Sequence, residues 1–266
     1  MNITDIYLSG EKLWGDDFNL EQIQKWHEDE KEGYAELGAK DKSSYKYVYH
    51  SLNKMHGFNY LPDNRFRNVL GLGSAYGDEF LPIAKNIERL TILDPSDAFV
   101  SEMVHGISCT YIRPRFDGKM PFENESFDLV TCLGVLHHIA NVTFVTKEIF
   151  RCLSHDGFAL IREPIVSMGD WSKLRPGLTK RERGIPLEKF RSIIQRAGFK
   201  IRHEALWFFP PIPKLAKVIG IEAYNSQLVT RIDELISKRM KWNVHYHSQK
   251  LLHKFRPRAV YFVLEK

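Results

Sequence analysis

Short apolar runs alternate with segments of helical periodicity from residue 68 to the end of the chain. Runs of this length, bounded by polar or turn-forming residues, are typical of buried strands. The predicted strands are 68–72, 90–93, 109–112, 127–133, 157–161, 201–208 and 259–264. The helices predicted among them are 78–86, 96–104, 142–153 and 186–197. This alternation predicts an α/β fold, with a mostly parallel sheet covered by helices on both faces.

Two regions lie outside this alternation. Residues 19–38 and 45–57 have helical character and precede the first strand, so they predict a helical cap. The segment 209–257 is longer than a tight connection requires, so it predicts an insertion before the last strand. Insertions at the end of a rigid sheet usually select the substrate. The predicted division is a helical cap at 1–60, a core at 61–208, a substrate-side insertion at 209–257 and the last strand of the core at 258–266.

The first predicted strand runs into a turn with three glycines, Gly71, Gly73 and Gly77. Glycine at such positions lets the backbone turn sharply and approach a ligand closely, as in nucleotide-cofactor loops. Tyr76, however, occupies the place of the third glycine in the dinucleotide fingerprint G-x-G-x-x-G. A nicotinamide-dependent oxidoreductase is therefore the least favoured interpretation of this turn.

Five motifs in order resemble those of the class I S-adenosylmethionine-dependent methyltransferases. They are residues 69–77, the acidic strand end in 91–96, the segment 116–122, the fourth strand with its loop at 126–139, and the turn at 152–158. The resemblance covers about 68–208 and the last strand. It implies S-adenosyl-L-methionine as the cofactor and a three-layer, Rossmann-like sheet whose last strand is antiparallel.

The resemblance also implies which residues bind the cofactor. Asp94 matches the carboxylate that accepts hydrogen bonds from the ribose hydroxyls, and Asp117 matches the one that contacts the adenine amino group. Asp94 as a mere helix cap near Ser96 is the alternative. The implied cofactor-binding residues are Gly71, Gly73, Ser74, Ala75, Gly77, Asp94, Pro95, Asp117, Gly118 and Leu133. Two of these depart from the family, which usually has an acidic residue at Gly71 and a glycine at Ala75.

The candidate catalytic residues follow from the chemistry that the resemblance implies. Methyl transfer from a sulfonium is an in-line displacement, and a hydroxyl acceptor needs a base. His137 and His138 lie in the loop that the resemblance places beside the methyl group, and Glu163 ends the fifth strand. We expect His138 to be the base, with His137 and Glu163 as further candidates. The alternative is that both histidines only shape the loop.

The charges predict an anionic partner. Residues 171–202 hold ten Lys or Arg and two Glu, whereas residues 1–36 hold ten acidic and three basic residues. Arginines can clamp a phosphate while tryptophan stacks on a ring or sugar, so the candidate substrate-binding residues are Trp171, Arg175, Arg181 and Arg183. A solvated basic face, or one that pairs with the acidic N-terminal region, is the alternative.

The C-terminal pattern 242–247, followed by the basic run 254–258, has a softer resemblance to bacterial methyltransferases of glycan biosynthesis. We therefore predict O-methylation of a sugar, a nucleotide sugar or another small anionic acceptor. The alternatives are methylation of RNA or of another small molecule, and a catalytically silent binding protein.

The three cysteines form no C-x-x-C pair and predict neither a disulfide framework nor a metal site. Cys132 lies inside an apolar strand, where a buried cysteine is favoured over a nucleophile. The chain contains no apolar run of about 18 residues, so we predict no membrane span and a cytoplasmic protein.

Overall fold

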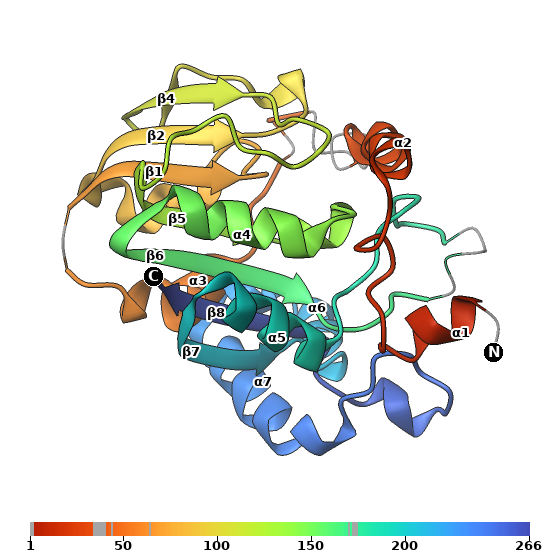
Figure 1. Cartoon of the computed structure of the whole chain (residues 1–266). Helices are drawn as coiled ribbons and strands as arrows, with labels where there is room; N and C mark the ends of the chain where they lie inside the picture. Colours follow the sequence, from red (N-terminus) through yellow and green to blue (C-terminus); the bar gives the residue numbers. More distant parts are fainter. Residues whose placement is uncertain (1–2, 34–40, 44, 64, 170, 172–174) are drawn as a thin grey trace.

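The computed structural model describes residues 3–33, 41–43, 45–63, 65–169, 171 and 175–266. Its centre is an eight-stranded sheet in the order β3-β4-β2-β1-β5-β6-β8-β7 (Figure 1). The strands are β1 Phe66–Leu72, β2 Ile87–Leu93, β3 Met103–Val104, β4 Ile107–Ile112, β5 Phe127–Leu133, β6 Leu153–Pro164, β7 Lys200–Trp207 and β8 Ala259–Glu265. From β4 to β6 every pairing is parallel, whereas β8 runs antiparallel between β6 and β7.

Helices cover both faces of this sheet, as the sequence predicts. On one face, α4 (Val142–Cys152) and α5 (Leu187–Ala197) pack against it (Figure 1). On the other face lie α3 (His50–His56), the 3₁₀ segment η3 (Asp78–Asn86), α6 (Pro211–Val218) and α7 (Gln227–Arg239). Each face buries its own apolar cluster. The three-layer Rossmann-like prediction is confirmed, including its antiparallel last strand.

The prediction of a helix over 96–104 is wrong. Ser96 caps a single 3₁₀ turn, η4 (Asp97–Phe99), by accepting a hydrogen bond from Ala98 N. Phe99 is buried beside Ala75 and Tyr76, and the chain then enters β3, which pairs with β4. The helical turn ends at Phe99 because this side chain packs against the turn after β1 and residues 103–104 pair as a strand.

Two other segments differ in detail. The element at Asp78–Asn86 is a 3₁₀ helix rather than an α-helix. In an α-helix the ring of Pro82 would clash with the backbone carbonyl of Asp78, four residues earlier. The helix expected at 45–57 is confined to α3, whose first residue is His50.

The helix α2 (Leu20–Glu30) lies across the carboxyl ends of the parallel strands (Figure 1). A capping box between Asn19 and Gln22 fixes where it begins. Its buried residues are Ile23, Trp26 and Glu30, so a mixed apolar and acidic face meets the edge of the sheet.

The remaining elements are short. The helix α1 (Ile3–Leu8) begins the described chain, and single 3₁₀ turns occur at η2 (Phe58–Tyr60), η5 (Leu136–His138), η6 (Ala223–Asn225), η7 (Lys241–Asn243) and η8 (Leu252–Lys254). Among the described residues, no helix combines the length and apolarity that crossing a bilayer requires.

Candidate active site

The turn after β1 has the backbone geometry that its glycines predict. Gly73 has a φ of +61°, and a Cβ there would lie 2.6 Å from Val135. Ala75 also adopts a left-handed conformation, with a φ of 47°, and its amide donates to Asp94 Oδ2 at 3.1 Å. This conformation gives a physical reason for the glycine that the resembled family usually has there, because glycine adopts it without steric cost. Here alanine holds the same turn.

Three neighbouring cavities open at this edge of the sheet. The apolar cavity lies under α2, and Ile23, Leu72, Leu93, Met120 and Val145 are among its lining residues. The turn cavity follows the residues after β1 and the end of β2. The basic cavity lies beyond them, against β6, β7 and the segment 247–258.

These cavities share walls. The apolar and turn cavities have Gly73, Pro95, Val135 and His138 in common. The turn and basic cavities have Tyr49, Gly134, His137 and Arg162 in common. The turn cavity is therefore the link between a pocket for an apolar ring and a positively charged pocket.

Asp94 ends β2 and lines the turn cavity. It is buried, and its two carboxylate oxygens accept the amides of Ala75 and Ser96 at 3.1 and 3.0 Å. Burial raises the pKa of this carboxyl group, and the two backbone hydrogen bonds partly offset that effect. The predicted ribose contact and the alternative capping role are thus compatible in one side chain, since each oxygen has a second lone pair.

Asp117, the residue expected to contact the adenine amino group, is bonded within its own loop. Its carboxylate pairs with Arg115 at 2.7 Å and accepts the amide of Lys119 at 3.0 Å. Its neighbour Gly118 lines the apolar cavity, whereas Asp117 is not among the described residues that line any of the three cavities. The carboxylate therefore stabilises its own loop.

The other predicted cofactor residues divide into two groups. Ser74 and Leu133 line the turn cavity, as Ala75 does. Gly71 and Gly77 lie behind the turn, where a Cβ would collide with Ser74 and with Val104 respectively. These two glycines allow close packing of the turn.

His137 and Glu163 form a buried pair at the junction of the turn and basic cavities. Glu163 Oε2 lies 2.6 Å from His137 Nδ1. Glu163 Oε1 accepts the amides of Val135 and Leu136 at 2.8 and 2.7 Å, which fixes the loop after β5. Burial, and then the neighbouring His138, lower the pKa of His137. The imidazole is consequently neutral at neutral pH.

His138 belongs to a second pair, on the side of α2. Its Nδ1 lies 2.8 Å from Glu30 Oε2, and the Thr179 hydroxyl donates to the same oxygen at 2.5 Å. Trp26 Nε1 donates to the backbone oxygen of His138 at 2.6 Å. Burial acts to raise the pKa of Glu30, but the hydrogen bonds from His138 and Thr179 outweigh it, so the pKa is lowered. This pair attaches α2 to the loop.

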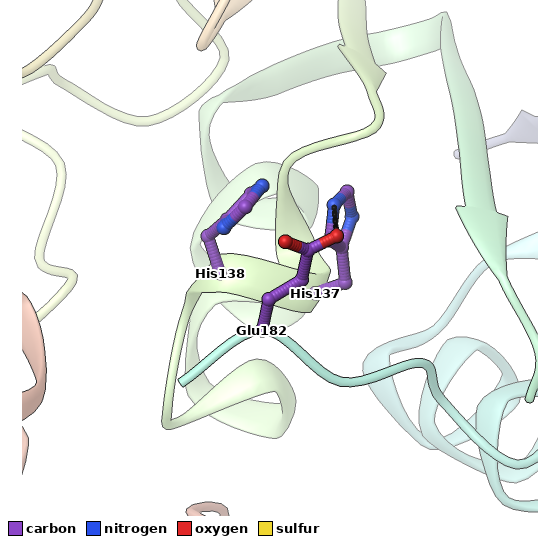
Figure 2. A group of neighbouring side chains, drawn as sticks. All are labelled: His137, His138 and Glu182. Atoms are coloured by element: carbon purple, nitrogen blue, oxygen red, sulfur yellow. Dashed lines mark ion pairs between the residues drawn. The ribbon is translucent and has the colours of Figure 1, made fainter. Parts of the chain in front are cut away.

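Glu182 lies between the two histidine rings (Figure 2). His137 Nε2 is 3.7 Å from Glu182 Oε1, and the three side chains offer ligand atoms within 4.8 Å of one another. Two imidazoles and a carboxylate are donors that suit a divalent transition metal. The sequence predicts no metal site. Its residue spacing does not indicate this group of three side chains, because Glu182 lies more than 40 residues after the two histidines.

The four predicted substrate-binding side chains are used to hold the structure together. Arg183 is fully buried and donates to the backbone oxygens of Trp14, Leu136, Ile139 and Ala140. Arg175 likewise donates to four backbone oxygens, those of Met168, Thr179, Lys180 and Glu182.

Arg181 pairs with Asp29 of α2, and Trp171 stacks on Trp14 with ring centroids 4.9 Å apart. Of the described residues that line the three cavities, none is one of these four. Of the four, Arg181 shows the pairing of the basic segment with the acidic N-terminal region that was the alternative noted from the charges.

The basic cavity contains residues that sequence reasoning missed. Arg162 on β6 is buried, donates to Asn53 Oδ1 at 3.0 Å and to Leu133 O at 3.1 Å, and lies 4.0 Å from the centre of the Tyr49 ring. The cavity also includes Trp207, Phe208, His247, Lys254, Arg256 and Arg258. The sequence signal for Arg162 was a charged residue at the end of an apolar strand. The basic run 254–258 was recognised from the sequence, but its place beside β6 and β7 was not.

Comparison with known proteins finds similarity to methyltransferases. Residues 70–161 match the family model described as a methyltransferase domain. An uncharacterized methyltransferase, YcgJ of Bacillus subtilis, is 24% identical over 98 residues, which is 35% of this chain. The alignment spans 39% of that relative's length.

Solved structures resemble the chain over most of its length. An S-adenosylmethionine-dependent methyltransferase from Mesorhizobium loti aligns with a TM-score of 0.51 and 18% identity, over 79% of this chain and 95% of that one. The cyclase SpnF aligns with a TM-score of 0.58 and 14% identity, over 92% and 96%. At these identities the likeness shows the fold, and the fold alone does not determine the reaction.

Proposed function

Since residues 70–161 match a methyltransferase domain, we propose that this chain transfers the methyl group of S-adenosylmethionine to an oxygen atom of a small anionic acceptor. The acceptor would be a molecule such as a sugar or nucleotide sugar. The observation that carries this proposal is the position of His137, which lines both the turn cavity and the basic cavity. A base at the junction of a cofactor cavity and a second cavity is what methylation of a hydroxyl requires.

The residues around the first two cavities fit S-adenosylmethionine. The apolar cavity suits the adenine ring, and the buried carboxylate of Asp94 suits the ribose hydroxyls. A side chain at Gly73 would collide with Val135, so the glycine keeps this stretch of the turn open to a ligand. When bound, the cofactor supplies a methyl group on a positively charged sulfur.

Glu163 and His137 would move the acceptor's proton. With Nδ1–H held against Glu163, the Nε2 atom keeps its lone pair and can accept a proton from a hydroxyl. The lowered pKa of His137 leaves the ring neutral and ready to do so. His138, favoured from the sequence, lines the apolar and turn cavities but not the basic cavity. Its Nδ1 atom lies against Glu30 and Thr179, and we assign it to holding α2.

The basic cavity would bind the acceptor. Lys254 and Arg258 supply positive charge, while Trp207 and Phe208 supply aromatic surface. Such a combination suits an anionic molecule with a ring, because cations bind its phosphate or carboxylate and an aromatic face packs against the ring. The sequence argument reached the same acceptor class through other arginines.

Calorimetry followed by a transfer assay tests the proposal. We expect the chain to bind S-adenosylmethionine and its demethylated product but not NAD, and to move labelled methyl from the cofactor to members of a panel of sugar phosphates and nucleotide sugars. Binding of NAD alone would contradict the proposal. Binding of S-adenosylmethionine with no transfer to the panel or to RNA would favour a catalytically silent binding protein.

A further inference from the structure

The helix α7 has its polar side turned inward. Thr230, Asp233 and Ser237 are buried, whereas Leu228 and Leu235 are 69% and 64% exposed. The buried face is stabilised because Asp233 accepts the amides of Phe208 and Phe209, both at 2.8 Å. The apolar side of a helix normally faces the core. In α7, a helix on the outside of the sheet (Figure 1), it faces outward.

The end of α6 extends this exposed apolar surface. Val218 and Ile219 are 83% and 69% exposed, and α6 contacts α7 directly. We call the combined surface the insertion face, and it consists of Leu215, Val218, Ile219, Ile221, Leu228, Ile232 and Leu235. Large exposed apolar patches of this kind mark sites where another molecule binds.

Positive charges accompany the insertion face. The exposed cations on the same two helices are Lys214, Lys217, Arg231, Lys238 and Arg239. Of the nearby acidic residues, Asp233 is buried and Glu222 lies 3.6 Å from Lys46. Glu234 is half-buried and lines a separate cavity with Tyr60 and His203. A second copy docked through the same face would bring these cations together, which is unfavourable. The surface therefore fits a partner that is both apolar and anionic.

We propose that the insertion face binds the surface of an anionic lipid bilayer. A helix with a basic, polar surround and an exposed apolar stripe lies in the plane of a membrane interface and buries that stripe among the acyl chains. Each nearby lysine or arginine adds attraction to anionic headgroups.

Co-sedimentation of the full chain with vesicles tests this proposal. We expect binding to phosphatidylcholine vesicles that contain phosphatidylglycerol to exceed binding to pure phosphatidylcholine by about tenfold or more, and to fall as salt rises. The double variants Val218→Ser with Ile219→Ser, and Lys214→Glu with Lys217→Glu, should each lower the binding about tenfold.

Val100→Ser is the matched control, since Val100 is 59% exposed and lies outside the insertion. It should bind vesicles like the unmodified chain, and circular dichroism should show that all variants fold. Equal or absent binding to the two kinds of vesicle would overturn the proposal. A dimer in analytical ultracentrifugation that Val218→Ser with Ile219→Ser abolishes, without vesicle binding, would assign the face to a second copy instead.

Discussion

Two carboxylate and histidine pairs lie next to each other at the end of β5, and they have different surroundings. In the first pair, Glu163 holds His137 between two cavities. In the second, Glu30 and Thr179 hold His138 beneath α2, between the apolar and turn cavities and away from the basic cavity. Adjacent histidines therefore differ in what lies beside them rather than in their own chemistry. Under the proposed function, the first pair would transfer the acceptor's proton and the second would fix α2 over the apolar cavity.

The largest expected difference is between the two histidines themselves. His137→Asn should lower turnover by about 10²–10⁴, the usual contribution of a general base, with little change in cofactor affinity. His138→Asn should lower turnover far less and should weaken cofactor binding, because α2 loses an attachment. Steady-state kinetics and calorimetry measure both quantities. The opposite pattern would return the role of base to His138.

Exchanging one carboxylate in each pair sharpens the comparison. Glu163→Gln keeps one oxygen to accept the loop amides, but it replaces the other oxygen by an NH₂ group. That group cannot accept a hydrogen bond from His137 Nδ1–H, so turnover should fall by about tenfold or more. Glu30→Gln should act mainly on cofactor affinity. The assay is kcat against cofactor Kd in the two variants. Equal losses of kcat would mean that the two pairs share one role.

The dependence of kcat/KM on pH tests which of the two histidines must be neutral for activity. In the proposed mechanism the neutral form of His137 accepts the proton, and the pKa of this histidine is lowered below the ordinary 6.5. Activity should therefore persist below pH 6.5 and be lost as pH falls further through the lowered pKa. His138→Asn removes a neighbouring group that lowers this pKa, so the acid limb should move to higher pH. An acid limb that does not move would show that the limb belongs to another group.

The smallest expected effect concerns the attachment of α2. Trp26→Phe keeps the ring packing but removes the hydrogen bond to His138 O, which is worth about 1 kcal/mol. Cofactor affinity should fall about fivefold, with kcat almost unchanged. Ile149→Val is the packing control, because Ile149 is buried on α4 and lines none of the three cavities. A loss of kcat in Trp26→Phe would mean that α2 also positions reacting groups.

The sequence was sufficient for the parts of the molecule that depend on neighbouring residues. Seven of the eight strands were predictable because each contains a short apolar run, whereas β3 was not predicted. The turn at Gly73 was predictable from its glycines. The helix expected at 96–104 failed because Phe99 packs against the turn and Val104 pairs with β4, and neither contact is visible in local periodicity.

The candidate site was less predictable because its partners come from distant segments. The roles of Arg181 and Arg183 depend on Asp29 and on backbone oxygens of the loop after β5. The basic cavity is likewise assembled from β6, β7 and the segment 247–258. Residue type and spacing identified charged side chains, but which of them face a cavity depends on the tertiary fold.

A crystal structure of the chain with the demethylated cofactor product tests the central claim most directly. The account predicts that the product's sulfur lies at the junction of the turn and basic cavities, nearer to His137 than to His138, with the adenine under α2. A sulfur nearer to His138, or one that faces away from the basic cavity, would contradict it.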